Sequence, residues 1–203
     1  MSDDPKTQTF KSEEEMYAYI EEQEDILNRL DAAFAKVKKK PKPSEGLPES
    51  PTPFAETLRL AREGDPVSQY NLSTAYKKGD GVAQDSDSSR YWLLQSADNG
   101  FPPAQYDIGC YLMDSGDRQN ALAWFMLAAK QNFGPAQFNV GILCGTGGDY
   151  LRAYVWLYLA EQNRVEKAKE NRQKVATFLS SEELSEAHRS VSAMMMDFKN
   201  RVE

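Results

Sequence analysis

The sequence predicts an all-α protein, built as a short right-handed α/α solenoid of helical repeats with an extra N-terminal helix. Trp92, Trp124 and Trp156 are spaced 32 residues apart. Each follows one copy of a six-residue pattern, which reads SQYNLS at 68–73, AQYDIG at 104–109 and AQFNVG at 136–141. A period between about 20 and 50 residues, without strand-like alternation, is typical of units that stack to complete a common core.

Composition narrows the class of protein. The 203 residues include 40 % hydrophobic residues and carry a formal net charge of -7. This acidic balance argues against general nucleic-acid binding, which normally requires a basic surface. The sequence has no apolar run of bilayer length and no secretory start, so we expect no membrane span and a cytoplasmic location.

The first 51 residues predict three segments. Residues 1–11 are expected to form a disordered tail, and residues 12–38 one helix with a serine cap, an acidic start and a basic end. Residues 39–51 are rich in proline and lysine and are expected to be a linker rather than a polyanion-binding or nuclear-localisation patch. The helix has heptad-spaced apolar residues, namely Met16, Ile20, Leu27, Leu30, Phe34 and Val37.

Two interpretations of this N-terminal helix remain open. It forms a coiled coil, with self-association through residues 16–37, or it is an amphipathic helix that folds back on the solenoid.

The repeat domain is expected over residues 52–163, as a half unit that ends at Gly64 followed by three repeats. The first helix of each repeat carries a buried stripe and then a small residue, which lets the second helix approach closely. The second helix carries the tryptophan, with small residues three positions before it and four after it on the same face. The stripe and small residues are Leu72 with Ser73, Ile108 with Gly109 and Val140 with Gly141, and the tryptophan neighbours are Ser89, Ser96, Ala121, Ala128, Ala153 and Ala160.

Glycine or asparagine is expected to end each second helix. These residues tolerate the left-handed conformation that stops a helix. The predicted stops are Gly64, Gly100, Asn132 and Asn163.

The first repeat closely resembles the SEL-one-like repeat, an α/α relative of the tetratricopeptide repeat. The resemblance covers roughly residues 57–163, and Leu112 and Cys144 depart from it where a tyrosine is usual. It implies a fold that binds other proteins. The residues that carry it are the Gln-Tyr-x-Leu opening at 69–72, Tyr76, Gly79, Gly81, Val82, Asp85, Trp92 and Ala97.

Residues 164–203 are expected to cap the solenoid with two helices, over 165–179 and 181–199. The second begins at Ser181 or with a capping box of Ser180 and Glu183. On this helix we expect His188 to be packed. Of the three methionines at 194–196, we expect two to point inward and one outward.

Catalytic and metal-binding patterns are not apparent in the sequence. The glycine-rich GTGGD at 145–149 lacks the lysine of a phosphate loop and predicts a tight turn. Cys110 and Cys144 are expected to be free thiols. The sequence therefore predicts no catalytic residue, no metal site and no cofactor.

A concave groove is the remaining candidate for function. In tetratricopeptide-like arrays the first helices line such a groove, so the resemblance implies partner-binding side chains on them. Asparagine and aspartate can hydrogen-bond an extended peptide, while Lys77 and Lys78 attract acidic groups. The aromatic residues at one repeat position fit packing between units better than ligand contact. The groove set is Tyr70, Asn71, Thr74, Lys77, Lys78, Tyr106, Asp107, Cys110, Met113, Phe138, Asn139 and Ile142.

The function expected from these features is a non-enzymatic adaptor that binds a protein or peptide partner. The alternative is a chaperone or regulatory subunit of one enzyme or of one secreted or membrane client. An enzyme whose groups assemble only in three dimensions is the less favoured third possibility.

Overall fold

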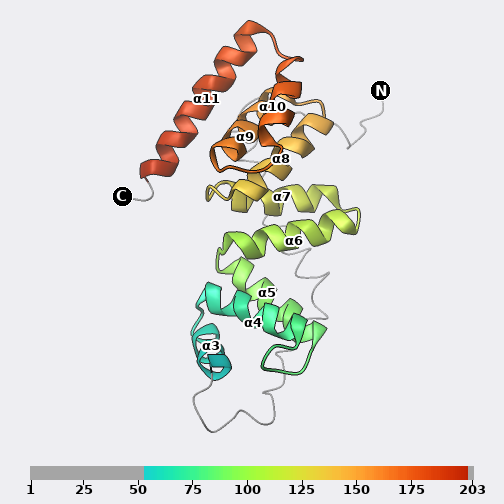
Figure 1. The fold of residues 1–203 in the computed structure, drawn as a ribbon, viewed down its shortest axis with the longest axis vertical. Helices are drawn as coiled ribbons and strands as arrows, with labels where there is room; N and C mark the ends of the chain where they lie inside the picture. The colour runs from blue at the N-terminus through green and yellow to red at the C-terminus, as the bar shows by residue number, and fades with distance from the viewer. Residues whose placement is uncertain (1–52, 201–203) are drawn as a thin grey trace. The chain divides into compact units, whose positions relative to one another are not determined.

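The computed structural model describes residues 53–200, which are entirely helical apart from turns (Figure 1). The helices are α3 to α11, and no strand occurs in this part of the chain. The all-α repeat fold expected from the sequence is confirmed. The tail, N-terminal helix and linker predicted at 1–11, 12–38 and 39–51 lie outside the described residues. Two compact units divide the rest, residues 53–117 and residues 118–200.

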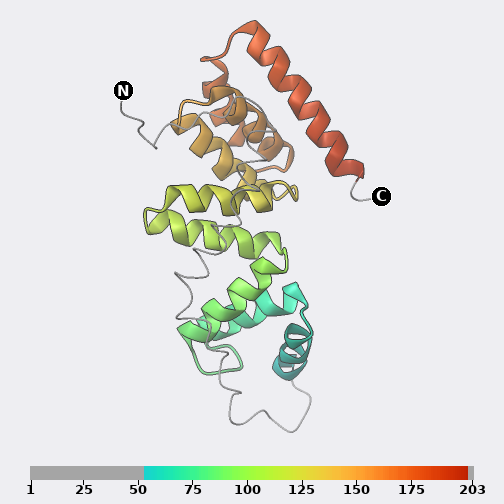
Figure 2. The same ribbon diagram turned by 180° about the vertical axis from the view of Figure 1, so that it is seen from behind.

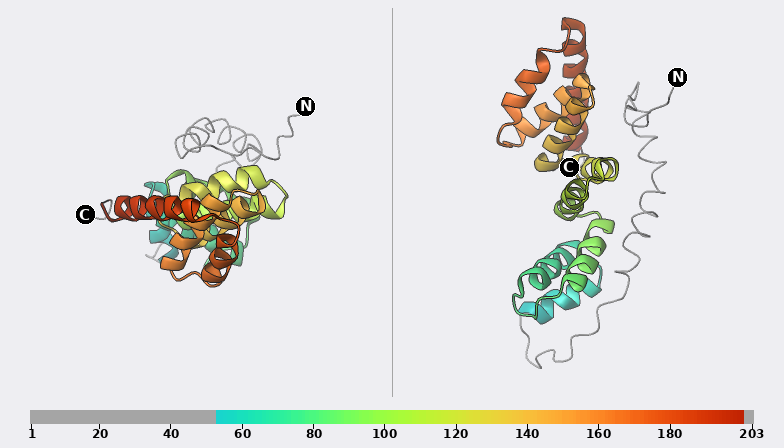
Figure 3. Two further views of the ribbon diagram at one scale, coloured as in Figure 1. Left: turned by 90° about the horizontal axis from the view of Figure 1, so that it is seen from above. Right: turned by 90° about the vertical axis from the view of Figure 1, so that its right-hand side faces the viewer.

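The first unit is a helical hairpin with one helix packed on each side. It contains α3 (Pro53–Arg62), α4 (Pro66–Lys78), α5 (Ser86–Asp98) and α6 (Pro102–Asp114). Helices α4 and α5 form the hairpin, α3 packs on α4 and α6 packs on α5 (Figure 3). Apolar faces meet in a core of Leu58, Ala61, Leu72, Tyr76 and Trp92.

Helices α4 and α5 begin at aspartate caps. The Asp65 carboxylate accepts a hydrogen bond from the Ser68 backbone N–H at 2.7 Å, and Pro66 occupies the first turn of α4. Asp85 accepts from the Asp87 N–H at 3.0 Å and from the Ser88 hydroxyl at 2.6 Å. The backbone bonds satisfy donors that have no partner within the helix. Hydrogen bonds from the Ser68 and Ser88 side chains, together with these backbone bonds, hold the pKa of both carboxyls below its usual value.

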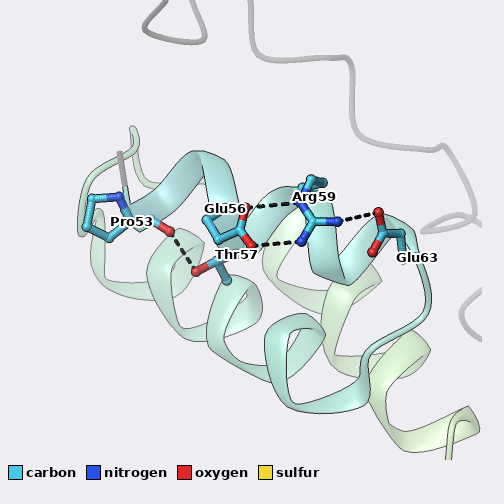
Figure 4. A network of polar contacts seen from close by, with 5 residues as sticks. All are labelled: Pro53, Glu56, Thr57, Arg59 and Glu63. Carbon is cyan, nitrogen blue, oxygen red and sulfur yellow. Dashed lines mark hydrogen bonds and ion pairs between the residues drawn. The ribbon is translucent and has the colours of Figure 1, made fainter. Parts of the chain in front are cut away.

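The outward face of α3 carries a charged network (Figure 4). The Arg59 guanidinium donates to Glu56 at 2.8 and 3.0 Å and to Glu63 at 2.6 Å. Because these side chains are more than half exposed, water screens the attraction. Burial of Leu58 and Ala61 on the opposite face therefore fixes α3 to the unit.

The second unit is arranged around α9. It contains α7 (Arg118–Ala129), α8 (Gly134–Thr146), α9 (Tyr150–Gln162), α10 (Ala168–Ala176) and α11 (Ser181–Asn200). Helices α8, α10 and α11 all pack on α9, and Figure 2 shows the long α11 along one side of it. The position of α9 explains why seven of its residues are buried.

The predicted role of the tryptophans and their small neighbours is confirmed. All three indoles are buried, as are the six small residues around them. Gly141 also allows the close approach expected of it, because a Cβ added there would lie 2.6 Å from Leu157 Cγ. A larger residue at this position would push α8 and α9 apart.

Three of the four predicted helix stops are confirmed, and the fourth is displaced by one residue. Gly64, Gly100 and Asn132 have positive φ angles of 98°, 83° and 61°. Asn163 has φ -81°, and Arg164 takes the left-handed conformation instead, with φ 59°. The left-handed conformation recurs 32 residues after Asn132, so the position in the repeat sets it and not the type of residue.

The C-terminal helices differ from the prediction at the methionines. The capping box is present, since Ser180 N–H donates to Glu183 at 2.7 Å and Glu183 N–H donates to Ser180 at 3.2 Å. Met194 is buried, whereas Met195 and Met196 are 43 % and 67 % exposed. The prediction of two inward methionines is therefore wrong, because consecutive helical residues turn by about 100° and only one of the three can face α9.

His188 is also less buried than expected. Its side chain is exposed, yet its ring packs edge-on to Tyr154 and Tyr158 and its Nε2 lies 3.0 Å from the Tyr154 hydroxyl. Arg172 Nη1 donates to the same hydroxyl at 2.9 Å. The Tyr154 hydroxyl of α9 therefore contacts side chains of both α10 and α11.

Candidate protein-binding surface

The exposed side of α4 carries the first set of candidate groove residues. Asn71, Lys77 and Lys78 are exposed, and their side chains make no hydrogen bond or ion pair within residues 53–200. Thr74, one helical turn after Tyr70, is half-buried. Gln84 Nε2 donates to the Lys77 carbonyl at 2.8 Å, which ties the following turn to this end of α4. The surface therefore presents one unengaged amide and two unengaged ammonium groups.

Tyr70 and Asp107 join two consecutive repeats. The Tyr70 ring packs edge-on to Phe101 with centroids 5.4 Å apart, and its hydroxyl donates to Asp107 Oδ2 at 2.9 Å. Burial, together with the hydrogen bond and the negative charge of Asp107, raises the pKa of Tyr70 to about 12. Asp107 Oδ1 accepts no hydrogen bond within the described part of the chain, so it remains able to accept one from a ligand.

Helix α6 continues the surface with more apolar character. Tyr106, Cys110 and Met113 are half-buried. Tyr111, which the groove prediction left out, is 53 % exposed. It follows Cys110 directly and has Ala75 and Leu143 as its counterparts in the other copies, so the repeat pattern alone gave no signal for it.

The remaining candidates lie on α8 in the second unit. Phe138, Asn139 and Ile142 are all half-buried there. Within the first unit the structure brings together Tyr70 and Asp107, as their hydrogen bond shows. The α8 residues stay separate candidates, each at its place in its own unit.

Buried glutamines position these first helices, a role that the sequence reasoning missed. Gln69, Gln105 and Gln137 each donate from Nε2 to a backbone carbonyl eight residues earlier, at 3.0, 3.2 and 3.3 Å. Asn99 and Asn163 donate in turn to the Oε1 of Gln69 and Gln137, both at 2.8 Å. The signal was present, because glutamine occupies the same place in all three copies of the pattern.

The cysteines of the two candidate helices are free, and neither is poised as a nucleophile. Burial is the largest influence on both and raises the pKa of Cys110 above its ordinary value and that of Cys144 to about 12. A reactive cysteine needs the opposite shift, because the thiolate is the nucleophile.

Residues 53–200 give little support for a metal site or a membrane-spanning helix. They contain no group of three or more histidine, cysteine or acidic side chains placed to hold a metal ion. None of the helices in this range combines the length and apolar composition that a bilayer crossing requires.

Stacked helical pairs, joined by buried amides, define the class of protein as an α/α repeat protein. The Sel1 repeat pattern matches residues 66–101, 102–133 and 134–163. The structure is similar to that of a Sel1 repeat protein from Oxalobacter formigenes, with 31 % identity, a TM-score of 0.56 and coverage of 59 % of this chain and 96 % of that one. The chain belongs to the Sel1 repeat family.

A second solved structure is also similar. It is c5321, a protective antigen of uropathogenic Escherichia coli strains displaying an SLR fold, with 23 % identity and a TM-score of 0.40. The match covers 71 % of this chain and 41 % of that one. A comparison with curated proteins gives no match.

Proposed function

We propose that this chain is a non-enzymatic adaptor whose α4–α6 surface binds an extended segment of a protein partner. Sel1-repeat proteins generally mediate protein–protein interactions. The observation that supports this surface in particular is the set of unengaged polar groups along α4, beside an aspartate that Tyr70 holds in position. Asp107, which the Tyr70 hydroxyl already orients, loses little entropy when it binds a ligand.

The chemistry of the partner follows from these groups. Asn71 can pair with both the N–H and the C=O of a peptide backbone, and Asp107 Oδ1 can accept a further N–H. Lys77 and Lys78 favour acidic side chains near the end of the segment that lies over the C-terminus of α4. A cytoplasmic location remains part of the proposal on the strength of the sequence alone.

Affinity capture with the full chain tests the proposal. The Asn71→Ala/Lys78→Ala variant should lose a partner that the unmodified protein captures, while its helical circular dichroism stays the same. The matched control is Lys169→Ala/Gln173→Ala, which removes one lysine and one amide from the exposed face of α10. A partner captured equally by all three proteins would place the binding surface elsewhere.

A further inference from the structure

A cavity of about 410 Å³ lies within the second unit, at the C-terminal ends of α9 and α11 and the turn between α7 and α8. Its apolar wall consists of Leu159, Met195 and Phe198. Its polar rim consists of Asn132, Gln162, Asn163 and Lys199. Met195 is 43 % exposed, so part of this apolar wall is accessible to a ligand.

The polar rim has hydrogen-bond donors left over. Asn163 Nδ2 is engaged, since it donates to Asn132 Oδ1 and to Gln137 Oε1, both at 2.8 Å. Asn132 Nδ2, the Gln162 amide and the Lys199 ammonium donate to no partner within residues 53–200. A complementary ligand therefore carries an acceptor, and the charge of Lys199 favours a carboxylate. The apolar wall requires an apolar group next to that carboxylate.

The N-terminal segment of this chain has both features. Residues 12–28 contain seven acidic residues and no basic one, interleaved with the heptad-spaced apolar residues Met16, Ile20 and Leu27. An apolar stripe of this kind needs a surface to cover it. A segment of the same chain also binds at a high effective concentration, which a free partner must match by affinity.

We propose that residues 12–38 bind this cavity within the same chain, with an apolar residue of the stripe against Leu159, Met195 and Phe198 and a nearby carboxylate against Lys199. The inference is independent of the partner surface on α4 and α6. It selects the folded-back helix over self-association through residues 16–37.

Zero-length carbodiimide cross-linking of the full chain tests the contact directly, because it joins a lysine only to a carboxylate that already touches it. Peptide mass spectrometry should find Lys199 joined to an acidic residue between 13 and 25. A mixture of nitrogen-15-labelled and unlabelled protein identifies the origin of each cross-link. Cross-links found exclusively within one isotopic form support the proposal, and cross-links that join the two forms indicate binding between chains and overturn it.

Two neighbouring methionines provide a matched pair of variants. Met195→Asp puts a negative charge, of the same sign as the carboxylates of the N-terminal segment, into the cavity wall. It should lower the Lys199 cross-link yield roughly tenfold, as expected when an apolar contact is lost and a repulsion gained. Met196→Asp makes the same change one residue away, at a side chain that does not line the cavity, and should leave the yield unchanged. Leu27→Asp makes the change on the N-terminal segment instead and should also lower the Lys199 cross-link yield.

The absence of a Lys199 cross-link in the unmodified protein would overturn the proposal. Equal yields in Met195→Asp and Met196→Asp would do so as well, since they would mean that the segment touches Lys199 without using the cavity. Both sites are exposed, so neither substitution should prevent folding.

Discussion

The α4–α5 and α8–α9 helix pairs have the same repeat fold, but different contacts hold their helices together. In the first pair, Ser89 Oγ donates to the Ser73 carbonyl at 2.9 Å and Ser96 Oγ donates to the Pro66 carbonyl at 2.6 Å. In the second pair, alanines occupy both of these serine positions, and Gly141 stands in place of Ser73 against Leu157.

This difference shows which property the repeat requires. Small size is common to both interfaces, whereas polarity is not. A buried hydroxyl is tolerated where it donates a hydrogen bond to a carbonyl of the facing helix. An alanine serves equally well where no such bond is made. We therefore expect the two pairs to respond differently to the same kind of substitution.

The largest effect is expected from removing a tryptophan. Trp156→Ala and Trp92→Ala should each lower the free energy of unfolding by about 3 to 5 kcal/mol, because a large cavity replaces the indole. Trp156, with 1 % exposure among apolar neighbours, should cost more than Trp92, with 6 % exposure beside serines. Urea unfolding followed by circular dichroism measures both. If the two losses in the free energy of unfolding were equal or in the reverse order, the two interfaces would not differ in the way described.

Gly141→Ala should have the next largest effect. The added Cβ would lie 2.6 Å from Leu157 Cγ and 3.2 Å from the Leu157 backbone nitrogen, so overpacking should lower stability by about 1 to 3 kcal/mol.

Gly145→Ala is the matched control on the same helix. Its Cβ would meet Ala153 Cβ at 3.5 Å, an ordinary contact, so the higher helix propensity of alanine should leave stability unchanged or raise it by up to about 1 kcal/mol. Equal losses at both positions would show that Gly141 is not a specific point of close approach.

Ser89→Ala gives the first pair the residue of the second and should have a smaller effect. It removes the bond to the Ser73 carbonyl, so we expect a loss of about 1 kcal/mol. Ala153 is the equivalent residue in α9, and Ala153→Ser makes the reverse change. It should also destabilise, because a new buried hydroxyl needs an acceptor. A stabilising Ser89→Ala would mean that the polar contacts are dispensable in the first pair too.

The smallest effect concerns Tyr70 at alkaline pH. Its pKa is raised from 10.0 to about 12 in the folded protein, so its contribution to stability is complete below about pH 10 and is lost as the pH rises through 12. Tyr70→Phe has no ionisable hydroxyl and should lack this part of the alkaline decline. Phenolate absorbance and thermal melting at pH 9 to 12 compare the two proteins, and an equal fall in melting temperature over this range would argue against the raised pKa of Tyr70.

Much of the fold was predictable from the sequence because the repeat shows the same physical requirement several times. Tryptophan among small residues recurs in three copies, so its burial follows from the pattern. The left-handed residue was harder to place at the last stop, where Arg164 has no special propensity for it and the preceding Asn163 looked like the better candidate.

The candidate surface was less predictable, since its contacts depend on neighbouring helices. The bond between Tyr70 and Asp107 joins residues 37 positions apart, and the sequence gives no sign that one holds the other. The exposure of Met195 depends on how α11 turns against α9, which the run of three methionines leaves open. The role of the buried glutamines could have been predicted, because glutamine occupies the same position in all three copies of the pattern.

A titration of the captured partner tests the central claim, that the exposed face of α4 binds protein, most directly. We predict that Asn71→Ala/Lys78→Ala weakens binding by about 1 to 3 kcal/mol while the melting temperature is unchanged, because both residues contribute hydrogen bonds or charge at an exposed face. Binding by the unmodified protein should also weaken at higher ionic strength, since salt screens the lysines. Lys169→Ala/Gln173→Ala should bind like the unmodified protein. Equal affinities for all three proteins at both ionic strengths would contradict the account.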